Sequence, residues 1–450
     1  MPINLNSIRQ RPVISQIGFL AKEREQTLYL SQWLWARQAV CLVDILARHS
    51  PRSSIQDKQS SSFRTQIRSS ISSTKLSKNK WGFGSWSWDT IIKDFQTEEK
   101  LYAAIKERRK QILDCRESWR SSIQVQQNIN PFYLGLKQIA VEQSYQGTYH
   151  ISTDRMKLSS EGISGAYFLS DNEGNNRFVI KPIDEDIDCI NNGKGFTSPY
   201  TRSTIRSNMP LYQSSMRETL AYEIACKIDV ANVAPRTALA ILECGAFNDQ
   251  IDYVAPEERV QYDRLIGSSK REKLCSVQEF ISNSKTLFEG LQDLQMAGLS
   301  DNEIEARFDQ KNFEDANILL WTTYDTDGHL NNFLVYPKST DAIGHEILGI
   351  KKIDNGLTFP EKNEEQRNNL RYLPNADRCL SAEARDKIAA ISIEDLCKQL
   401  SQFGLTGSID ALRQRIAVLK ELAQQQNLTL REIDYRMSIL TKQMDNGRLE

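Results

Sequence analysis

The chain has 450 residues, of which 40% are hydrophobic and 26% charged, so it is long enough for a sizeable core and is not collagen-like, fully disordered or a coiled coil. No run of about 18 uncharged apolar residues occurs, and the N-terminus lacks the charged-then-apolar order of a signal peptide, which predicts a cytoplasmic protein without a transmembrane segment. The eight cysteines are scattered without a Cys-x-x-Cys pair, and only four histidines accompany them, so we expect neither a disulfide framework nor a zinc site.

The formal net charge is −1, but the charge is unevenly distributed. Residues 1–80 contain 13 Lys and Arg against 4 Asp and Glu, whereas the other 370 residues contain 44 against 54. Such a basic arm either contacts an anionic partner or is a solvated tail. Because its charges are dispersed, the tail interpretation is favoured, with peripheral contact between residues 1–80 and an anionic membrane as the alternative. No nucleic-acid binding is expected.

The first 150 residues predict three segments. Residues 1–49 are an N-terminal helical region with an amphipathic pattern, and residues 50–80 are a Ser-rich basic linker that cannot bury enough apolar surface to order itself. Residues 81–150 are an aromatic and helical segment, which begins with a Trp- and Gly-rich cluster at 81–88. We expect this cluster to be a strand docked on the main domain, with insertion at a membrane interface or stacking on bases as the alternatives.

The remaining sequence predicts an α+β domain followed by helices. After Pro131 the pattern changes to short β-like runs separated by Gly, Asn and Asp, then to helices, and then to strands again between about 329 and 360. This order is typical of an α+β domain, which we place over residues 151–380. A C-terminal helical segment, residues 381–450, is expected to complete it, with Ser392 and Ser408 as helix N-caps.

The first candidate site is a glycine-containing hairpin. Gly162, Ser164 and Gly165 precede two strand-like runs joined by a polar turn, and the second run ends in Lys181. Backbone N–H groups of such a loop can approach phosphates, and a lysine on the next strand can meet them as a point charge. Many hairpins carry glycines, so an ordinary solvated lysine is the alternative.

A second candidate lies at the start of a predicted helix. Glu218 can pair with Lys181 and hold it against a phosphate, as a glutamate does in kinases. The spacing Ser215-x-x-Glu218 also fits a capping box, in which Glu218 would only satisfy a backbone N–H. Glu223, further along the same helix, is the second candidate for the partner of the lysine.

The third candidate is Asp327, which is followed five residues later by Asn332 at the start of a strand. This is the spacing of a kinase catalytic loop, where the aspartate orients or deprotonates the acceptor hydroxyl and the asparagine binds a metal ion. A calcium loop beginning at Asp325 is excluded, because its sixth position is Leu330 rather than Gly and its twelfth is Tyr336 rather than Glu.

The fourth candidate is Asp354, at the end of a predicted strand and directly before Asn355-Gly356. An aspartate here would hold the metal ion that bridges the nucleotide phosphates, although Asn-Gly between apolar runs also predicts a tight hairpin turn. Each segment has an ordinary structural alternative. Their order, which is a glycine loop, Lys, Glu, Asp-x4-Asn and Asp, predicts a kinase-like phosphotransferase.

These segments resemble the phosphatidylinositol 3-/4-kinase superfamily and are most similar to type II phosphatidylinositol 4-kinases and their plant relatives with ubiquitin-like domains. The resemblance covers about residues 155–430 and implies a two-lobed kinase-like fold, with an N-lobe at about 151–277 and a C-lobe at about 282–380. It is carried by Gly-Ile-Ser-Gly-Ala-Tyr-Phe at 162–168, Lys-Pro-Ile-Asp-Glu-Asp at 181–186, Arg-Glu-Thr-Leu-Ala-Tyr at 217–222, Val-Ala-Pro-Arg-Thr at 233–237, Asp-Thr-Asp-Gly-His-Leu-Asn-Asn at 325–332 and Ile-Asp-Asn-Gly-Leu-Thr-Phe-Pro at 353–360. Cys275–Ile281 is similar to the hinge between the lobes.

The resemblance implies a role for each matching residue. Asp327 would be the catalytic acid or base, and Glu218 would pair with Lys181. Asn332 and Asp354 would be the ligands of Mg²⁺. The residues that would contact ATP are Gly162, Ser164, Gly165, Val179, Lys181, Gln278, Glu279, Phe280, Leu334 and Ile353.

Three departures from the family pattern concern the membrane and the acceptor. Only Cys189 stands in the region where animal relatives have a palmitoylated cysteine cluster, so acyl anchoring is not expected. Gly328 stands where many relatives have Arg, and residues 361–371 contain as many acidic as basic residues, although a lipid kinase needs cations there. Phosphatidylinositol is the first expected acceptor and a protein Ser or Thr hydroxyl is the second. A nucleotide-binding pseudokinase scaffold is the third reading, which the complete set of catalytic residues argues against.

Overall fold

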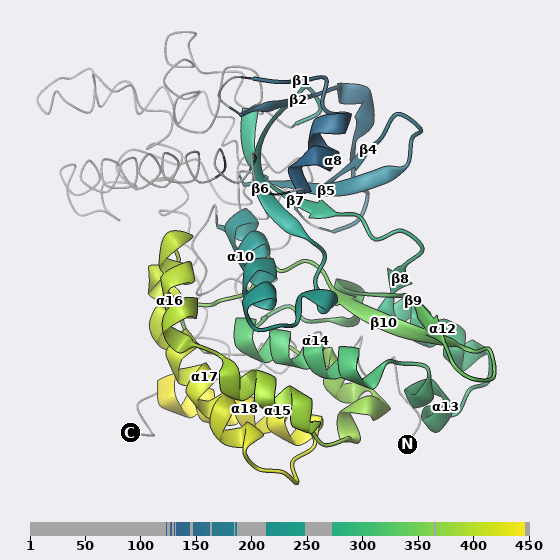
Figure 1. Ribbon diagram of the computed structural model, residues 1–450, viewed down its shortest axis with the longest axis vertical. Helices are drawn as coiled ribbons and strands as arrows, with labels where there is room; N and C mark the ends of the chain where they lie inside the picture. Colours follow the sequence, from purple (N-terminus) through teal and green to yellow (C-terminus); the bar gives the residue numbers. More distant parts are fainter. Residues whose placement is uncertain are drawn as a thin grey trace, which may run out of the picture. The chain divides into compact units, whose positions relative to one another are not determined.

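The computed structural model describes residues 132–144, 147–162, 164–183, 185–186, 213–247, 272–363 and 366–445, together with Ile123, Gln127 and Asn130 (Figure 1). The predicted helical region at 1–49, the linker at 50–80, the aromatic cluster at 81–88 and Cys189 lie outside the described residues. No helix in the described part of the chain is long and apolar enough to span a bilayer.

The described residues form two compact units. The sheet unit consists of the described residues within 123–186 and 239–277, and the helical unit consists of those within 213–238 and 278–445. The boundary passes through two strands, between Ala238 and Leu239 and between Val277 and Gln278, and the second point lies in the segment predicted as a hinge. The expected two-lobed α+β fold is confirmed.

The sheet unit contains a mixed sheet with the strand order β1-β2-β6-β7-β5-β4-β3. Its strands are β1 (Glu142–Gln143), β2 (Tyr149–Ile151), β3 (Met156–Leu158), β4 (Tyr167–Ser170), β5 (Asn176–Pro182), β6 (Thr237–Cys244) and β7 (Glu272–Glu279), and the 3-10 turn η1 (Thr153–Arg155) precedes β3. β2 pairs with β6 in parallel, whereas β3, β4 and β5 are antiparallel neighbours. Helix α8 (Phe132–Ile139) packs on β2, where its Tyr133 ring stacks on Tyr149.

β4 and β5 form the hairpin that the sequence predicts. Alternate residues of β5 are buried from Phe178 onward, the period of two expected of a strand with one face on a core. The turn is held by Asp171, whose carboxylate accepts the backbone N–H groups of Glu173 and Asn175 at 2.9 and 3.0 Å. Gly174, with φ of 85°, provides the left-handed residue that the turn requires. Local sequence therefore specifies this hairpin.

The helical unit is built around α14 (Gln310–Thr323), which packs against α15 (Ala382–Ala390), α17 (Ile409–Ala423) and α18 (Leu430–Asp445) (Figure 1). Every residue of α14 from Asn312 to Thr323 is buried, so this helix is covered on all sides. The other helices are α10 (Ser214–Lys227), α12 (Leu287–Met296), α13 (Asp301–Ala306) and α16 (Ile393–Gln402), with 3-10 turns η2 (Ala231–Val233), η3 (Leu330–Asn332), η4 (Asn369–Tyr372), η5 (Pro374–Asp377) and η6 (Thr406–Ser408).

The helical unit also contains a small antiparallel sheet with the order β10-β9-β8. Its strands are β8 (Lys285–Thr286), β9 (Phe333–Thr340) and β10 (Glu346–Lys352). β9 and β10 confirm the strands predicted between about 329 and 360. The alternative interpretation of Asn355-Gly356 as a tight hairpin turn is wrong, because no described strand follows β10.

The predicted N-caps of the C-terminal helices have different outcomes. Ser392 caps α16, and its side chain accepts the N–H of Asp395 at 3.3 Å, as expected. Ser408 occupies the cap position of α17 but makes no capping hydrogen bond; its hydroxyl donates instead to the carbonyl of Phe359 at 2.6 Å. Ser408 therefore ties α17 to the segment that follows β10.

Candidate active site

The predicted catalytic loop begins where α14 ends. Tyr324 terminates the helix in the left-handed conformation, with φ of 52°, and its hydroxyl lies 3.0 Å from Thr441 Oγ1 in α18. Thr326 donates to the carbonyl of Leu357 through both its backbone N–H and its hydroxyl, at 3.3 and 3.0 Å. The loop is thus held to α18 on one side and to the segment after β10 on the other.

A buried ion pair connects this loop to the end of β10. Lys352 Nζ lies 2.7 Å from Asp325 Oδ2, and the two side chains are 1% and 0% exposed. The other oxygen of the Asp325 carboxylate accepts the backbone N–H of Asp327 at 2.8 Å. Lys352 Nζ also donates to the carbonyls of Ile353 and Asp354, at 2.5 and 3.2 Å. One ion pair therefore holds the backbone at both Asp327 and Asp354.

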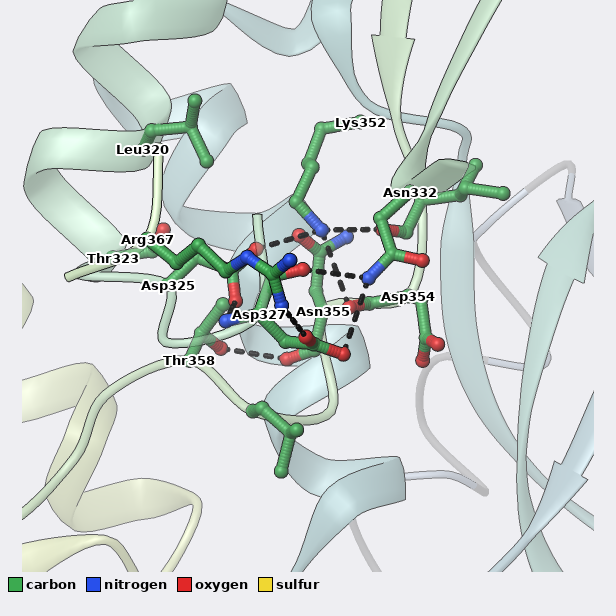
Figure 2. Close-up of polar contacts among 12 residues, drawn as sticks. Leu320, Thr323, Asp325, Asp327, Asn332, Lys352, Asp354, Asn355, Thr358 and Arg367 are labelled. Carbon is green, nitrogen blue, oxygen red and sulfur yellow. Dashed lines mark hydrogen bonds and ion pairs between the residues drawn. The ribbon is translucent and has the colours of Figure 1, made fainter. Parts of the chain in front are cut away.

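Asp327 lies in a polar cluster, with Asn332 and Arg367 beside its carboxylate (Figure 2). Asn332 Nδ2 donates to the Asp327 carbonyl at 2.7 Å and lies 3.4 Å from Oδ2, while Arg367 Nη1 lies 3.4 Å from Oδ1. Burial, followed by the charges of Asp325 and Asp354, raises the pKa of Asp327 to about 7 against the effect of two nearby cations. A carboxyl with a pKa near neutral pH is suited to general acid or base catalysis.

His329 contributes no charge to this cluster at neutral pH. Its Nε2 lies 3.6 Å from Asp327 Oδ2, but burial, followed by the charges of Arg367 and Lys352, lowers the pKa of His329 to about 4. Among the described residues, Arg367 is therefore the charged cation in contact with the Asp327 carboxylate.

Asp354 follows β10 in the left-handed conformation, with φ of 57°, and its side chain is exposed. The segment after it is held to α10, because Arg217 donates to the carbonyls of Thr358, at 2.5 Å, and of the following residue. Glu218 is 1% exposed, and a Cβ on Gly356 would lie 3.7 Å from its Oε1. α10 thus carries Glu218 beside the turn that follows Asp354.

Two alternatives to the role of Glu218 concern α10: a capping box at Ser215 and Glu223 as the partner of Lys181. The helix begins at Ser214 with Gln213 as its N-cap, so the capping box predicted from Ser215 is wrong. Glu223 points to α16, where its Oε2 accepts a long hydrogen bond of 3.4 Å from Gln399. Glu218 therefore remains the first candidate for the partner of Lys181.

The predicted metal ligands, Asn332 and Asp354, provide oxygen donors of the type that Mg²⁺ prefers. Asn332 donates through Nδ2, which directs its amide nitrogen to Asp327 and leaves the amide oxygen as an acceptor. No group of three or more His, Cys, Asp or Glu side chains within the described residues is placed to hold a metal ion. A metal ion held by Asn332 and Asp354 would therefore need further oxygens from a nucleotide or water.

The predicted phosphate loop lies in the sheet unit. Gly162 has φ of 73°, and Ser164 and Gly165 lead into β4. The N–H of Gly165 donates to the carbonyl of Glu185 at 2.7 Å, and a Cβ on Gly165 would lie 2.6 Å from the Glu185 Cβ. Only glycine fits at position 165 without displacing Glu185. Lys181 is half-buried near the end of β5.

A second buried ion pair supports this loop and was missed by the sequence analysis. Lys273 Nζ lies 2.6 Å from Glu185 Oε1, with side chains 4% and 0% exposed, and the Tyr167 hydroxyl donates to the other oxygen of the same carboxylate. Lys273 Nζ also lies 5.7 Å from the centre of the Phe247 ring. The residue against which Gly165 packs is thus itself held by charged and polar partners.

The predicted hinge contains groups that are already engaged. The N–H of Glu279 donates to the carbonyl of Arg236 at 2.8 Å, and the Glu279 carboxylate pairs with the Arg236 guanidinium through two contacts of 2.8 and 3.0 Å. Gln278 Nε2 lies 3.3 Å from Thr237 Oγ1. A nucleotide at the hinge would therefore use backbone groups other than the Glu279 N–H.

The two units carry different parts of the predicted site. The helical unit brings Asp327, Asn332 and Asp354 together and places Glu218 beside the same turn. The predicted ATP-contacting residues are divided between the sheet unit (Gly162, Ser164, Gly165, Val179, Lys181) and the helical unit (Gln278, Glu279, Phe280, Leu334, Ile353). The pairing of Lys181 with Glu218 stays a prediction.

Two of the three cations in the segment at 361–371 contact carboxylates of the helical unit. Arg371 Nε lies 3.2 Å from Asp434 Oδ2, and Asp434 is 1% exposed. Arg367 contacts Asp327, as described above, and Lys362 is exposed. The catalytic loop has Gly328 rather than a cation beside Asp327, but Arg367 places a guanidinium next to the Asp327 carboxylate.

An α+β chain in which an Asp-x4-Asn loop and a following aspartate meet at the end of a small sheet has the arrangement of a kinase-like phosphotransferase fold. No protein-family model matches the chain. Curated proteins do match it. It is 25% identical over 265 residues to phosphatidylinositol 4-kinase gamma 5 of Arabidopsis thaliana, a match that covers 58% of this chain and 36% of the relative. Phosphatidylinositol 4-kinase gamma 6 of the same plant is 26% identical over 281 residues, with 60% of this chain and 40% of the relative covered.

The expected relationship to phosphatidylinositol 4-kinases is therefore confirmed at the level of sequence, and the matches span 40% or less of the length of these two relatives. Among solved structures, the chain is similar to one described as the Golgi casein kinase with Mn/ADP bound, with 13% sequence identity and a TM-score of 0.33. That likeness covers 66% of this chain and 74% of the other, and it is too weak to carry an argument.

Proposed function

We propose that the chain is a kinase that transfers the γ-phosphate of ATP to a hydroxyl group. Its metal ion would be Mg²⁺, and the first candidate acceptor is a phosphatidylinositol. The observation that carries this proposal is the convergence of Asp327, Asn332 and Asp354 on a loop that a buried ion pair holds in place. The sequence relationship to plant phosphatidylinositol 4-kinases supports the same reaction class.

In the proposed reaction, Asp327 accepts the proton of the acceptor hydroxyl. The acceptor oxygen then bonds to the γ-phosphorus while the bond from that phosphorus to the bridging oxygen breaks, and ADP leaves. Mg²⁺ held by Asn332 and Asp354 would neutralise charge on the phosphate oxygens. Catalysis of this kind depends on positioning and electrostatics, so a buried ion pair that holds the Asp327 backbone serves it directly.

The residues predicted to contact ATP keep those roles in this proposal. Gly162, Ser164 and Gly165 would cover its phosphates, and Lys181, paired with Glu218, would contact them. The half-buried side chains of Val179, Phe280, Leu334 and Ile353 would provide an apolar lining for adenine. In this proposal residues 151–380 form the catalytic domain, completed by the helices of 381–450.

A protein Ser or Thr hydroxyl is the second candidate acceptor. The observation that favours an acceptor without phosphate groups, such as a protein hydroxyl, is that Arg371 pairs with the buried Asp434 and Arg367 lies beside Asp327, so that Lys362 is the exposed cation of 361–371. A ring already carrying several phosphates would need free cations to meet it. An acceptor hydroxyl without neighbouring phosphates, on unphosphorylated phosphatidylinositol or on a protein, is consistent with this surface.

The acceptor can be tested in one incubation. The full chain is given γ-labelled ATP and Mg²⁺ together with phosphatidylinositol vesicles and a protein lysate, and the products are separated by solvent extraction. Label in the organic phase supports the lipid kinase, and label confined to protein supports the second candidate. No label in either phase, with nucleotide binding intact, would contradict the kinase proposal and favour a pseudokinase scaffold.

A further inference from the structure

The segment after Asp354 returns to pack directly on the catalytic loop at Gly328. The N–H of Asn369 donates to the Gly328 carbonyl at 2.9 Å, and the N–H of Arg367 donates to the Asp325 carbonyl at 3.0 Å. A Cβ on Gly328 would lie 2.1 Å from the Arg367 carbonyl oxygen, far inside van der Waals contact. A side chain at position 328 and a segment in this position are therefore mutually exclusive.

A buried hydrogen-bond network holds the same segment at Asn368. Asn368 Nδ2 donates to Asp434 Oδ1 at 2.8 Å and to Asn317 Oδ1 at 2.9 Å, and Trp321 Nε1 donates to the same Asp434 oxygen at 2.9 Å. Asn368 and Asp434 are 0% and 1% exposed. The backbone at Arg367 is thus held by contacts that do not involve its own side chain.

The Arg367 side chain extends from this anchored segment to the Asp327 carboxylate (Figure 2). It is 30% exposed, and within the described residues its side chain makes one ion pair, the 3.4 Å approach of Nη1 to Asp327 Oδ1. A guanidinium has five N–H donors in a planar fork, and a contact of this length leaves most of them available to an anion. Between Asp327 and Asn332 the loop itself has the residues Gly328, His329, Leu330 and Asn331, with no Lys or Arg among them.

We propose that Arg367 binds the γ-phosphate of the nucleotide beside Asp327, so that the segment after β10 supplies the cation that the catalytic loop lacks. This inference rests on the proposed function and assigns a residue to it. During transfer, Arg367 forms and breaks no covalent bond; its N–H donors stabilise the phosphoryl oxygens while the proton of the acceptor passes to Asp327. Gly328 has a role in this arrangement, because only glycine allows the segment to reach the loop.

Nucleotide binding tests the proposal without requiring turnover. Calorimetry with the full chain and Mg²⁺ would compare ADP with a β,γ-imido analogue of ATP, for the wild type, Arg367→Met and Arg367→Lys. Loss of a charge-assisted bond to the γ-phosphate should weaken binding of the analogue about tenfold or more in Arg367→Met while affinity for ADP stays within about twofold. Arg367→Lys should retain part of the difference. Arg413→Met, an exposed Arg on α17, is the matched control and should change neither affinity.

Two results would overturn the inference. Equal losses for ADP and the analogue would mean that Arg367 only supports the structure, and unchanged affinities for both would mean that it does not meet the nucleotide. Transfer measured on the same proteins separates this inference from the proposed function. If the wild type transfers phosphate but Arg367→Met binds the analogue normally, the inference fails alone. If the wild type transfers no phosphate but Arg367→Met selectively loses affinity for the analogue, the kinase proposal fails while the contact between Arg367 and the γ-phosphate stands.

Discussion

Replacing Lys352 by methionine is the most informative single perturbation of the catalytic loop. Methionine has a similar length, so the main change is removal of the ammonium group that lies 2.7 Å from Asp325. The carboxylate would remain 0% exposed, with the Asp327 N–H as its remaining hydrogen-bond donor. Removing one partner of a buried ion pair typically costs about 3–5 kcal/mol. We therefore expect Lys352→Met to lower the free energy of unfolding by about this amount.

A double-mutant cycle separates the ion pair from general damage. In Asp325→Asn/Lys352→Met no charge is left buried, so the double variant should be more stable than Lys352→Met by about 2 kcal/mol or more. The free energies are measured by denaturant unfolding with two spectroscopic probes, because the chain has two units and a single transition must be verified. Lys398→Met, at an exposed position of α16, is the matched control and should change stability by less than about 0.5 kcal/mol. Additive losses in the double variant would refute the coupling.

Four further predictions concern other parts of the chain. Asp327→Ala and Asp354→Ala should each abolish phosphate transfer while leaving the unfolding midpoint within a few degrees of the wild type. Near-normal turnover of either variant would contradict the catalytic or metal-binding role proposed for that residue. Lys273→Met removes the ammonium group that lies 2.6 Å from the buried Glu185 carboxylate, which should cost about 3 kcal/mol of stability. Because Gly165 packs against Glu185, the same change should raise the KM for ATP, and an unchanged KM would show that this ion pair does not support the phosphate loop. Asp309 is the N-cap of α14. Its partial burial alone would raise the pKa of its carboxyl, but hydrogen bonds from a lysine ammonium and a backbone N–H hold this pKa below its usual range. The stability that the ionised Asp309 carboxylate provides is therefore present at neutral pH and lost on acidification. Asn still caps the helix but cannot pair with Lys338, so Asp309→Asn should cost up to about 1 kcal/mol at pH 7 and progressively less as the pH falls, whereas a pH-independent loss would contradict this origin. Deletion of residues 1–80 should weaken binding to anionic vesicles at low salt, with a smaller difference at high salt, if the arm contacts membranes; equal binding at all salt concentrations would leave the arm as a solvated tail.

Local patterns in the sequence predict the parts of the fold that depend on neighbouring residues. The β4–β5 hairpin and the cap at Ser392 follow from turn residues and capping residues. The spacing of Asp327 and Asn332 likewise predicts their contact, because only four residues separate them and the 3-10 turn η3 ends at Asn332.

The charged pairs that support the site could not be predicted in the same way. Lys273 and Glu185 are 88 residues apart, and Arg367 and Asp327 are 40 residues apart. In the sequence such residues look like ordinary surface charges, since Lys and Glu are rarely buried. Which charged residue is buried depends on how distant segments of the chain pack together, and the spacing of residues in the sequence does not contain that information. The one local signal that was available is the glycine at 328, whose missing side chain leaves room for the segment that carries Arg367.

The central claim is that Asp327 takes the proton of an acceptor hydroxyl during transfer of the γ-phosphate. The most direct test is single-turnover transfer from γ-labelled ATP by the wild type and by Asp327→Asn, which keeps the size of the side chain and one acceptor oxygen but cannot act as a base. We predict transfer by the wild type and a rate lower by about 10²-fold or more in Asp327→Asn, with ATP binding retained in both. Equal single-turnover rates would contradict the account.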